Sequence, residues 1–388
     1  ITRRDWSSDV CSSDLTNMKK FAALVLAGAM TLGLAACGGG NTSTPAASST
    51  PAASTPAAST PAASTGSDYA SLDPVVLRGA DSSGVGAAAQ QLGELVAEKV
   101  DAITGGQLTV EYYPNSEMGG DMDIQQQMLD GTLDYVVLQT APTVSFVPAV
   151  AVFDLPMVFA QYDGDTIDQV LNGDDSEFLK AIAPKYEEKN MKILGYLQNA
   201  TYRLTTSNVK LDTLDAFKGL QIRTMENQNH MAFWSALGAA PTPLAWPEVY
   251  ISLQNGTIDA QENAADTCMT SNFQEVQKYL NFTNHILYLN QIIINNDKFN
   301  SLDPLYQDAL TQAVEEAIAE LRPALTELDK SSKDTLAAGG MEMVEYAPEF
   351  YDEILNLQGV QDLYTKIDGE VDGLGTILQD ELAAVAGA

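Results

Sequence analysis

The sequence predicts an α/β fold in which helices cover a mostly parallel sheet. Alternating or continuous apolar runs predict strands at 75–80, 108–113 and 135–138. Helical spacing of apolar residues lies between these runs, at 86–100 and 122–129. A β-α-β-α-β order is typical of parallel sheets, which bind their ligands at the carboxyl ends of the strands.

The rest of the chain continues this pattern. A long helical stretch covers 303–336. Pro323 inside it predicts a kink, because proline lacks the backbone donor and clashes with the preceding turn. Short apolar runs predict further strands at 192–198, 220–223, 240–242 and 291–295.

Composition argues against several classes of function. The 388 residues carry 20 Lys and Arg against 52 Asp and Glu, a formal net charge of -32. Nucleic-acid binding and docking onto anionic lipid both need clustered cations. Three cysteines are too few for a disulfide scaffold, and two histidines leave little room for a metal centre. The sequence contains none of the common nucleotide-binding, zinc-protease or hydrolase motifs, so we expect no cofactor and no catalysis.

The N-terminal region predicts export and anchoring. We interpret 1–17 as a leader unrelated to the mature protein, and 18–36 as a signal peptide with two lysines before an apolar run. The run Leu-Ala-Ala-Cys-Gly around Cys37 resembles a bacterial lipoprotein cleavage box, which predicts lipidation of Cys37. An ordinary cleaved signal with an incidental cysteine is the alternative. Repeated Pro-Ala-Ala-Ser-Thr units within 37–71 predict a flexible tether.

Arginine is the informative residue type, because a protein this acidic repels anions unless it places donors locally. After position 36 the chain contains four arginines, which are Arg78, Arg203, Arg223 and Arg322. Arg223 ends an apolar run and Arg203 follows a predicted strand, so both lie at strand–loop junctions where α/β folds bind ligands. A guanidinium group can hold a carboxylate through two parallel hydrogen bonds. A surface ion pair is the alternative for either residue.

Several sequence runs occur in the order and at the spacing of one transport family. They are YPNS at 113–116, DGTLD at 130–134, AVFDLP at 151–156, FKGLQIR at 217–223, PTPLAWPEVY at 241–250, LQNGTIDAQEN at 253–263, EVQKYL at 275–280 and TNH at 283–285. Together they resemble the solute-binding proteins of tripartite ATP-independent periplasmic (TRAP) transporters, DctP type. The similarity extends over nearly all of 72–350.

This resemblance implies an α/β, periplasmic-binding-protein-like fold of two lobes, with a hinge and a long helix of the C-terminal half that bridges the lobes. The first lobe is expected to comprise 72–199 with about 289–327, and the second about 200–288 with 328–385. The resemblance also implies capture of a small organic acid in the interlobe cleft, and delivery to the small and large subunits of a TRAP permease. We expect a monomer held by its lipid anchor on the outer face of the cell membrane.

The resemblance further assigns roles to single residues. Arg223 matches the family arginine that clamps the ligand carboxylate, and Arg203 matches a second ligand-contacting arginine. Asn263 falls at a polar contact position, with a helix-capping role as the alternative. Trp246 falls at an aromatic position of the pocket, with a core role as the alternative. Gln139, just after a predicted strand, falls at a contact position of the first lobe.

Asp81 marks a departure from the family. It aligns with a ligand-facing loop in which many relatives carry a His-Pro pair, whereas this chain has Asp-Ser-Ser-Gly. A carboxylate in that loop would favour ligands with hydroxyl or amino groups and disfavour a second carboxylate.

Two other functions stay open at this point. The chain also fits a binding protein for an ATP-driven importer or a sensor kinase, because such proteins equally lack a nucleotide motif. A secreted enzyme acting on acids is the third hypothesis, and the missing pair of nucleophile and base argues against it.

Overall fold

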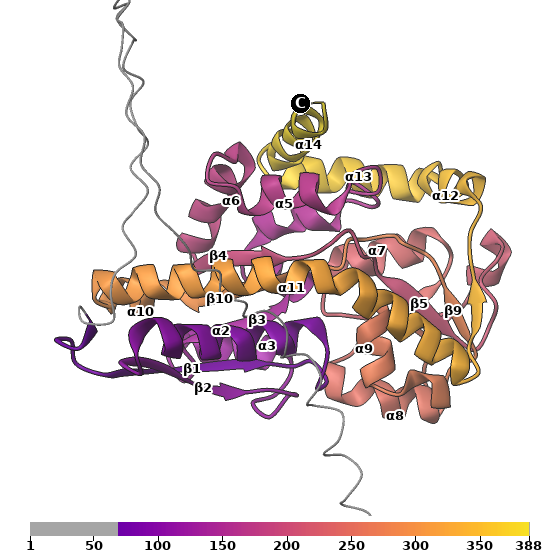
Figure 1. Ribbon diagram of the computed structural model, residues 1–388. Helices are drawn as coiled ribbons and strands as arrows, with labels where there is room; N and C mark the ends of the chain where they lie inside the picture. Colours follow the sequence, from indigo (N-terminus) through magenta and orange to yellow (C-terminus); the bar gives the residue numbers. More distant parts are fainter. Residues whose placement is uncertain (1–68, 388) are drawn as a thin grey trace, which may run out of the picture. The chain divides into compact units, whose positions relative to one another are not determined.

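Two mixed β-sheets, each with its own helices, organise the described part of the chain. The structure is a computed structural model that describes residues 69–387. The first sheet has the strand order β2-β1-β3-β10-β4, and the second has the order β11-β9-β5-β8-β6-β7 (Figure 1). The predicted leader, signal peptide, lipidated Cys37 and tether as far as residue 68 lie outside the described residues.

The predicted strands and helices are present, together with others that the sequence did not predict. The bounds of all strands and α-helices are as follows. The strands are β1 (Val75–Asp81), β2 (Leu108–Tyr113), β3 (Tyr135–Gln139), β4 (Met191–Leu197), β5 (Leu204–Ser207), β6 (Gln221–Thr224), β7 (Ala240–Pro243), β8 (Ala260–Asn263), β9 (Tyr279–Asn281), β10 (Asn290–Asn295) and β11 (Glu342–Val344). The α-helices are α2 (Ala88–Thr104), α3 (Asp121–Leu129), α4 (Thr140–Thr143), α5 (Gly164–Asn172), α6 (Glu177–Glu187), α7 (Gln228–Ala236), α8 (Val249–Gln254), α9 (Ala265–Thr270), α10 (Asn296–Ser301), α11 (Pro304–Ala338), α12 (Pro348–Leu355), α13 (Gln358–Glu370) and α14 (Leu374–Ala386).

The pairing of the strands is only partly parallel. β1 is parallel to β2 and β3, as the alternation of strands and helices predicts. β10, however, is antiparallel to both β3 and β4, and β5 is antiparallel to β8 and β9. Both exceptions follow segments that cross from one lobe to the other, so they enter their sheets from the opposite end. The prediction of a mostly parallel sheet is therefore wrong for these two strands.

Two crossing segments run side by side between the lobes. One connects β4 to β5 and the other connects β9 to β10. Tyr202 and Leu287 form an antiparallel bridge between them, and Tyr288 N donates to Thr201 O at 2.8 Å. This short paired segment connects the two sheets, and we expect the hinge of the two-lobed fold to lie here.

Helix α11 is a third connection between the lobes. This helix of 35 residues contacts α2 and β4 beside the first sheet and α9 beside the second. Pro323 lies inside it, and Figure 1 shows a bend along the helix. The predicted long bridging helix is thus confirmed, and its proline supplies a physical cause for the bend.

The ends of the described chain pack more widely than the sequence predicts. Tyr69 is buried and stacks on Tyr306 of α11 with ring centroids 6.2 Å apart, so packing begins before residue 72. At the other end, α13 contacts α7, whereas α14 contacts α5 and α6, which the sequence assigns to the first lobe. The C-terminal helices therefore touch both lobes, and the lobe boundaries remain a prediction.

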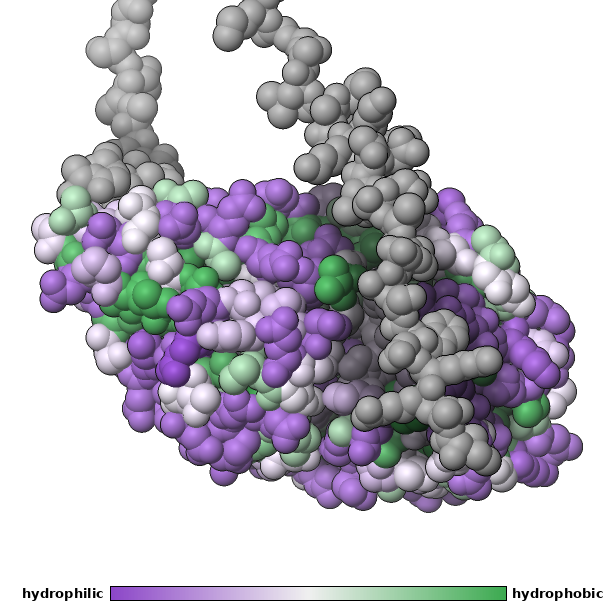
Figure 2. Space-filling model, turned by 90° about the horizontal axis from the view of Figure 1, so that it is seen from below, coloured by the Kyte–Doolittle hydropathy of each residue, from purple (hydrophilic) through white to green (hydrophobic). Residues whose placement is uncertain are grey.

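Polar side chains cover most of the face drawn in Figure 2. The most exposed large hydrophobic side chains among the described residues come from four separate segments and are Val76, Val85, Val209 and Ile251. Within 69–387, no helix combines the length and the apolar composition that crossing a bilayer requires.

Candidate functional site

A small cavity lies where strand ends of the two lobes meet. Gln139, the last residue of β3, reaches it from the first lobe. Arg223 of β6 and Asn263, the last residue of β8, reach it from the second lobe, with Trp246 beside them. The cavity has a volume of about 20 Å³. Its other lining residues are Ser82, Ser83, Asp121, Leu138, Met225 and Thr267.

Arg223 presents a buried guanidinium group with free donors. Its Nε donates to the backbone oxygen of Leu244 at 2.8 Å, while Nη1 is buried and has no hydrogen-bond partner among the described residues. The Trp246 ring lies 5.4 Å from the guanidinium carbon, within cation–π range. Burial lowers the pKa of Arg223 to about 10, so the group stays charged at neutral pH. A buried cation with an unpaired donor is a site prepared for an anion.

Arg203 is held by protein groups instead. Its Nη2 donates to Glu262 Oε1 at 3.0 Å and to the backbone oxygen of Glu262 at 2.8 Å, and its Nε also pairs with the Glu262 carboxylate. Its Nη1 donates to Gln139 Oε1. Arg203 does not line the cavity, so its predicted contact with ligand remains a prediction, and here it reaches the cavity wall only through Gln139.

Gln139 and Asn263 join the two lobes across the cavity. The Gln139 amide nitrogen donates to Asn263 Oδ1 at 3.3 Å, and the same oxygen accepts from the backbone nitrogen of Ala264 at 3.2 Å. No described residue accepts from the Asn263 Nδ2 group, which leaves a donor on the same side of the cavity as Arg223. The alternative role of Asn263 as a helix cap is not borne out, because Ala264 is the N-cap residue of α9 and the Asn263 side chain accepts from Ala264 rather than from the first turn of the helix.

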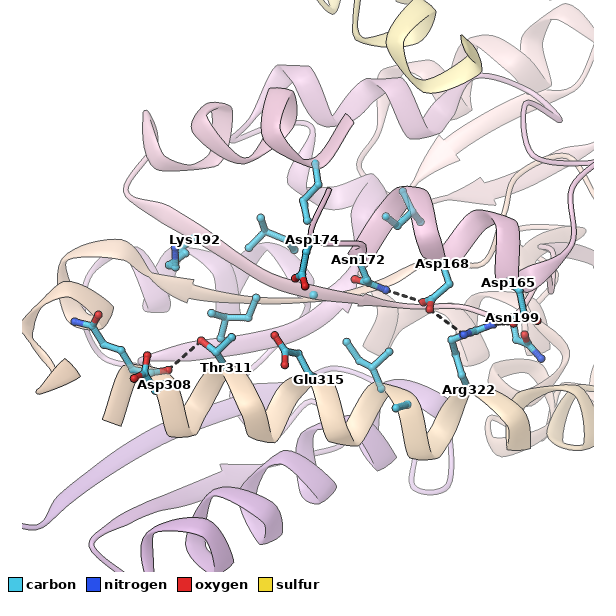
Figure 3. Close-up of a pocket in the computed structure, with 18 of the residues that line it drawn as sticks. Asp165, Asp168, Asn172, Asp174, Lys192, Asn199, Asp308, Thr311, Glu315 and Arg322 are labelled. Atoms are coloured by element: carbon cyan, nitrogen blue, oxygen red, sulfur yellow. Dashed lines mark hydrogen bonds and ion pairs between the residues drawn. The ribbon is translucent and has the colours of Figure 1, made fainter. Parts of the chain in front are cut away.

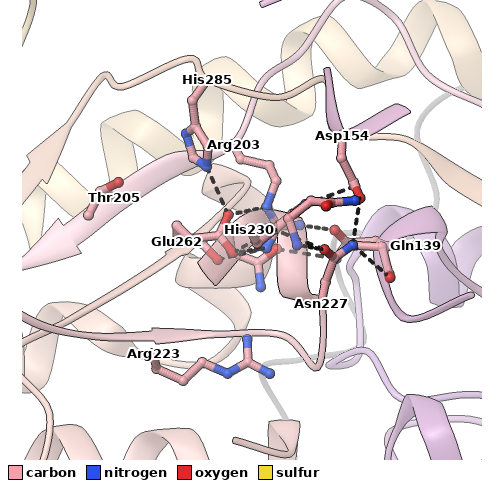
Figure 4. Close-up of polar contacts among 12 residues, drawn as sticks. Gln139, Asp154, Arg203, Thr205, Arg223, Asn227, His230, Glu262 and His285 are labelled. Carbon is pink, nitrogen blue, oxygen red and sulfur yellow. Dashed lines mark hydrogen bonds and ion pairs between the residues drawn. The ribbon is translucent and has the colours of Figure 1, made fainter. Parts of the chain in front are cut away.

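Glu262 is the main residue that sequence reasoning missed. It is fully buried on β8 and accepts from His285 Nε2 at 3.1 Å, while His230 Nδ1 lies 3.6 Å from its Oε1 (Figure 4). Burial alone would raise the pKa of Glu262, but the charge of Arg203, the hydrogen bond with His285 and the nearby ring of His230 hold it well below its usual range. Glu262 therefore anchors Arg203 as a buried carboxylate.

A second buried carboxylate, Asp154, extends this network into the first half of the chain. It accepts from Asn227 at 2.8 Å, from Asn229 at 3.0 Å and from His230 at 3.2 Å. These three partners lie at the start of α7. His230 thus lies between two carboxylates, Asp154 on one ring nitrogen and Glu262 on the other (Figure 4).

This position of His230 predicts a pH dependence of stability. Burial alone would lower the pKa of His230, but its hydrogen bond with Asp154 and the negative charges of Asp154 and Glu262 raise it to about 9. Because the pKa is higher in the folded than in the unfolded state, the stabilisation is complete below about pH 6.5 and is lost as the pH rises through about 9. We expect this group to contribute about 3 kcal/mol to the free energy of unfolding at pH 6.

Urea unfolding of the wild type and of His230→Gln between pH 6 and 10 measures this contribution. The difference between the two proteins isolates His230 from other groups that titrate above pH 8, such as the buried thiol of Cys268. The free-energy difference should shrink steadily above pH 7. A difference that does not change from pH 7 to pH 9.5 would mean that His230 is not protonated in the folded protein.

Asp81 lies behind the cavity wall and does not line it. Its carboxylate accepts from Tyr112 Oη and from the backbone nitrogen of Ser83, both at 2.7 Å. Burial raises the pKa of Asp81 to about 6. Asp81 therefore positions the loop whose next residues, Ser82 and Ser83, do reach the cavity. The acidic residue that lines the cavity is Asp121, which the sequence did not single out.

A larger cavity, of about 880 Å³, lies between α5, β4 and α11 (Figure 3). Its charged lining residues are Asp165, Asp168, Asp174, Asp308, Glu315, Lys192 and Arg322. Arg322 is already paired with Asp168 at 2.8 Å and with Asp165. Acidic side chains outnumber basic ones in this lining, five to two. These negative charges would repel an organic anion. The cavity beside Arg223, although much smaller, is therefore the better candidate for the ligand site.

Metal binding finds no support in this part of the chain. Residues 69–387 contain no group of three or more His, Cys, Asp or Glu side chains suited to hold a metal ion. His230 forms a hydrogen bond with Asp154, and His285 forms hydrogen bonds with Thr283 and Glu262. The site offers a buried cation with an unpaired donor, Arg223, to an anion. The neighbouring network of Arg203, Glu262, His230 and Asp154 is paired within itself.

The chain matches one protein family over most of its length. The match covers residues 79–365 and is to the bacterial extracellular solute-binding protein family 7, DctP. This protein belongs to the DctP family. It is therefore an extracytoplasmic solute-binding protein, and the two-lobed fold predicted from the sequence is that of its relatives.

Alignments with individual DctP-family relatives cover most of the chain. The 2,3-diketo-L-gulonate-binding periplasmic protein YiaO of Escherichia coli (strain K12) is 29% identical over 280 residues, which are 72% of this chain and 82% of that protein. The sialic acid-binding periplasmic protein SiaP of Vibrio cholerae serotype O1 is 29% identical over 232 residues, 60% of this chain and 70% of that protein. A crystal structure of a TRAP periplasmic solute-binding protein from Sulfitobacter sp. NAS-14.1 with bound β-D-galacturonate is 25% identical, with a TM-score of 0.73 over 79% of this chain and 100% of that chain.

Proposed function

We propose that this DctP-family protein captures a small organic acid by placing the ligand carboxylate on Arg223, and that it delivers the acid to a TRAP permease. The observation that carries this proposal is the buried, charged guanidinium group whose Nη1 lacks a partner at the cavity. Asn263 would donate a hydrogen bond to the ligand from its side-chain amide. The Trp246 ring packs over the guanidinium group of Arg223. The names of the relatives support an acid, because diketogulonate, sialic acid and galacturonate each carry a carboxylate.

Lobe movement is part of the proposal. A cavity of about 20 Å³ cannot hold an acid the size of a sugar, since ligand pockets are roughly 300 Å³ or more. The lobes must therefore separate at the paired crossing segments to admit the ligand, and then close around it. Closure removes water from the pair of carboxylate and guanidinium groups, which strengthens their attraction.

Thermal unfolding of the purified protein against a panel of organic acids tests this proposal. A ligand at about 1,000 times its dissociation constant should stabilise the fold by about 4 kcal/mol, which is a shift of several degrees. We expect a shift with at least one acid in the wild type and none in Arg223→Ala. Recovery of the acid unchanged after incubation would separate binding from an enzymatic function, and a shift that survives in Arg223→Ala would move the site elsewhere.

We also propose that the protein is a monomer anchored through a lipid on Cys37. The sequence around Cys37 supports the anchor, and the scattered exposed apolar residues support the monomer. Cells fed a labelled fatty acid should incorporate it into the wild type, and Cys37→Ser should carry no label and leave the membrane fraction. Label that persists in Cys37→Ser would contradict the anchor.

A further inference from the structure

Helix α2 begins without a cap of its own. Its N-cap residue is Ala87, which offers no side-chain hydrogen bond, and its first turn contains no acidic residue. The first N–H groups of any helix have no partner within the helix. Ala88 and Ala89 are only 3% and 0% exposed, so at this buried end the N–H groups need a partner from elsewhere in the protein.

Asp266 supplies this partner from the other lobe. The N–H group of Ala88 donates to Asp266 Oδ2 at 3.0 Å, and this hydrogen bond is buried. Asp266 lies in the first turn of α9, which follows β8 of the second sheet, whereas α2 packs on β1, β2 and β3 of the first sheet. The bond therefore crosses from one lobe to the other. It places a carboxylate at the positive end of a helix of 17 residues.

The carboxylate of Asp266 depends on this helix end in turn. Within residues 69–387 it forms no ion pair with a lysine, arginine or histidine side chain. Burial raises the pKa of Asp266, and the hydrogen bonds from Ala88 and Thr267 oppose that rise. The positive end of α2 is thus the favourable partner of a buried carboxylate, and separation of the two would remove a stabilising contact from both.

The interlobe bond lies beside the ligand cavity. The loop that leads into α2 lines one wall of this cavity with Ser82 and Ser83, and Thr267 of α9 lines the other side. The same loop approaches α9 a second time, since a Cβ atom on Gly84 would lie 3.0 Å from Thr270 Oγ1. The cavity of about 20 Å³ must widen to admit an acid the size of a sugar. Widening moves the loop away from α9 and would break the bond between them.

We propose that Asp266 is a positioning residue that holds the lobes closed around the ligand. It does not line the cavity, and it acts on the bound acid only by joining α9 to the start of α2. This inference rests on the proposed function, because it takes lobe closure as the step that traps the acid. A bond that exists only in the closed arrangement slows release and leaves the rate of binding nearly unchanged.

Stopped-flow fluorescence with D-galacturonate, D-galactonate and sialic acid measures both rates, because Trp246 lies at the cavity. Asp266→Asn keeps the shape of the side chain and removes its charge. We expect this variant to release any acid that the wild type binds about tenfold faster, and to bind it at the wild-type rate. Asp163→Asn is the matched control. Asp163 caps α5 within one lobe, where it accepts from Thr166 N at 2.8 Å, so its loss should lower stability and leave both rates unchanged.

Ala88→Pro tests the same bond from the other lobe, and it serves if Asp266→Asn does not fold. Proline lacks the N–H group that donates to Asp266, and it is a favoured residue at the first position of a helix. The extended backbone of Ala87 also suits a following proline. We therefore expect α2 to persist in this variant and the acid to leave about tenfold faster, as in Asp266→Asn.

The outcomes separate the inference from the proposed function. If the wild type binds one of the three acids and Arg223→Ala does not, a wild-type release rate in Asp266→Asn or in Ala88→Pro overturns the inference alone. Lower stability without faster release would likewise reduce Asp266 to a structural role and overturn it. Binding that survives in Arg223→Ala, or no binding of any of the three acids, contradicts the proposed function and removes the basis of the inference with it.

Discussion

Arg223→Ala should lower the affinity for the ligand on the order of 100-fold or more. The ligand carboxylate would then be buried without its charged partner, and truncation of one member of such a pair commonly has an effect of this size. The unliganded protein should lose little stability, because the substitution removes a buried cation that has an unpaired donor. Calorimetry for affinity and urea unfolding for stability measure the two effects separately.

Two companion variants sharpen this prediction. Arg223→Lys keeps the charge but not the forked donor geometry, so we expect an intermediate loss of affinity, about tenfold. Arg322→Ala removes the arginine of the larger cavity between α5 and α11 and should leave affinity unchanged. A loss in Arg322→Ala together with full binding in Arg223→Ala would place the ligand in the larger cavity and contradict the assignment.

Glu262→Gln should destabilise the fold by about 3–5 kcal/mol. Glutamine keeps the shape of the side chain, but Arg203 and the charged His230 would lose the carboxylate that neutralises them in a fully buried site. Breaking a buried ion pair by neutralising one partner leaves an uncompensated charge, which is the costly case. Urea unfolding at pH 7 measures the change.

Glu342→Gln is the matched control for Glu262→Gln. Glu342 also pairs with a cation, Lys210 at 2.9 Å, but its side chain is 55% exposed. An exposed pair contributes about 1 kcal/mol or less. If both variants lose a similarly small amount of unfolding free energy, water must reach the Glu262 network. The network would then not stabilise the fold as its buried geometry indicates.

The elements that the sequence predicts are those with an apolar pattern. Apolar runs or helical spacing of apolar residues predict seven strands and three helices, and all of them are present. They are β1 to β4, β6, β7 and β10, with α2, α3 and α11. β8 gives no such signal, because Gln261, Glu262 and Asn263 are polar and yet fully or almost fully buried. Their hydrogen bonds and ion pairs come from residues far along the chain, which local patterns do not reveal.

The candidate site divides in a similar way. Arg223, Trp246, Gln139 and Asn263 line one cavity, although whether they touch ligand is still a prediction. Asp81 falls one residue short of the cavity, since its side chain turns toward Tyr112 while Ser82 faces the space.

Glu262 and Asp121 were hidden among 52 acidic residues. One usable signal did exist for Glu262. The chain has only two histidines, and a buried carboxylate in the central strand is a natural partner for both.

A crystal structure of the protein with galactonate, or with whichever acid gives the largest thermal shift, tests the central claim most directly. The account predicts that the carboxylate oxygens of the ligand lie within hydrogen-bond distance of Arg223 Nη1 and Nη2, with Glu262 still on Arg203. A carboxylate bound instead to Arg203, with Glu262 or Gln139 displaced, or a ligand outside this cavity, would contradict it.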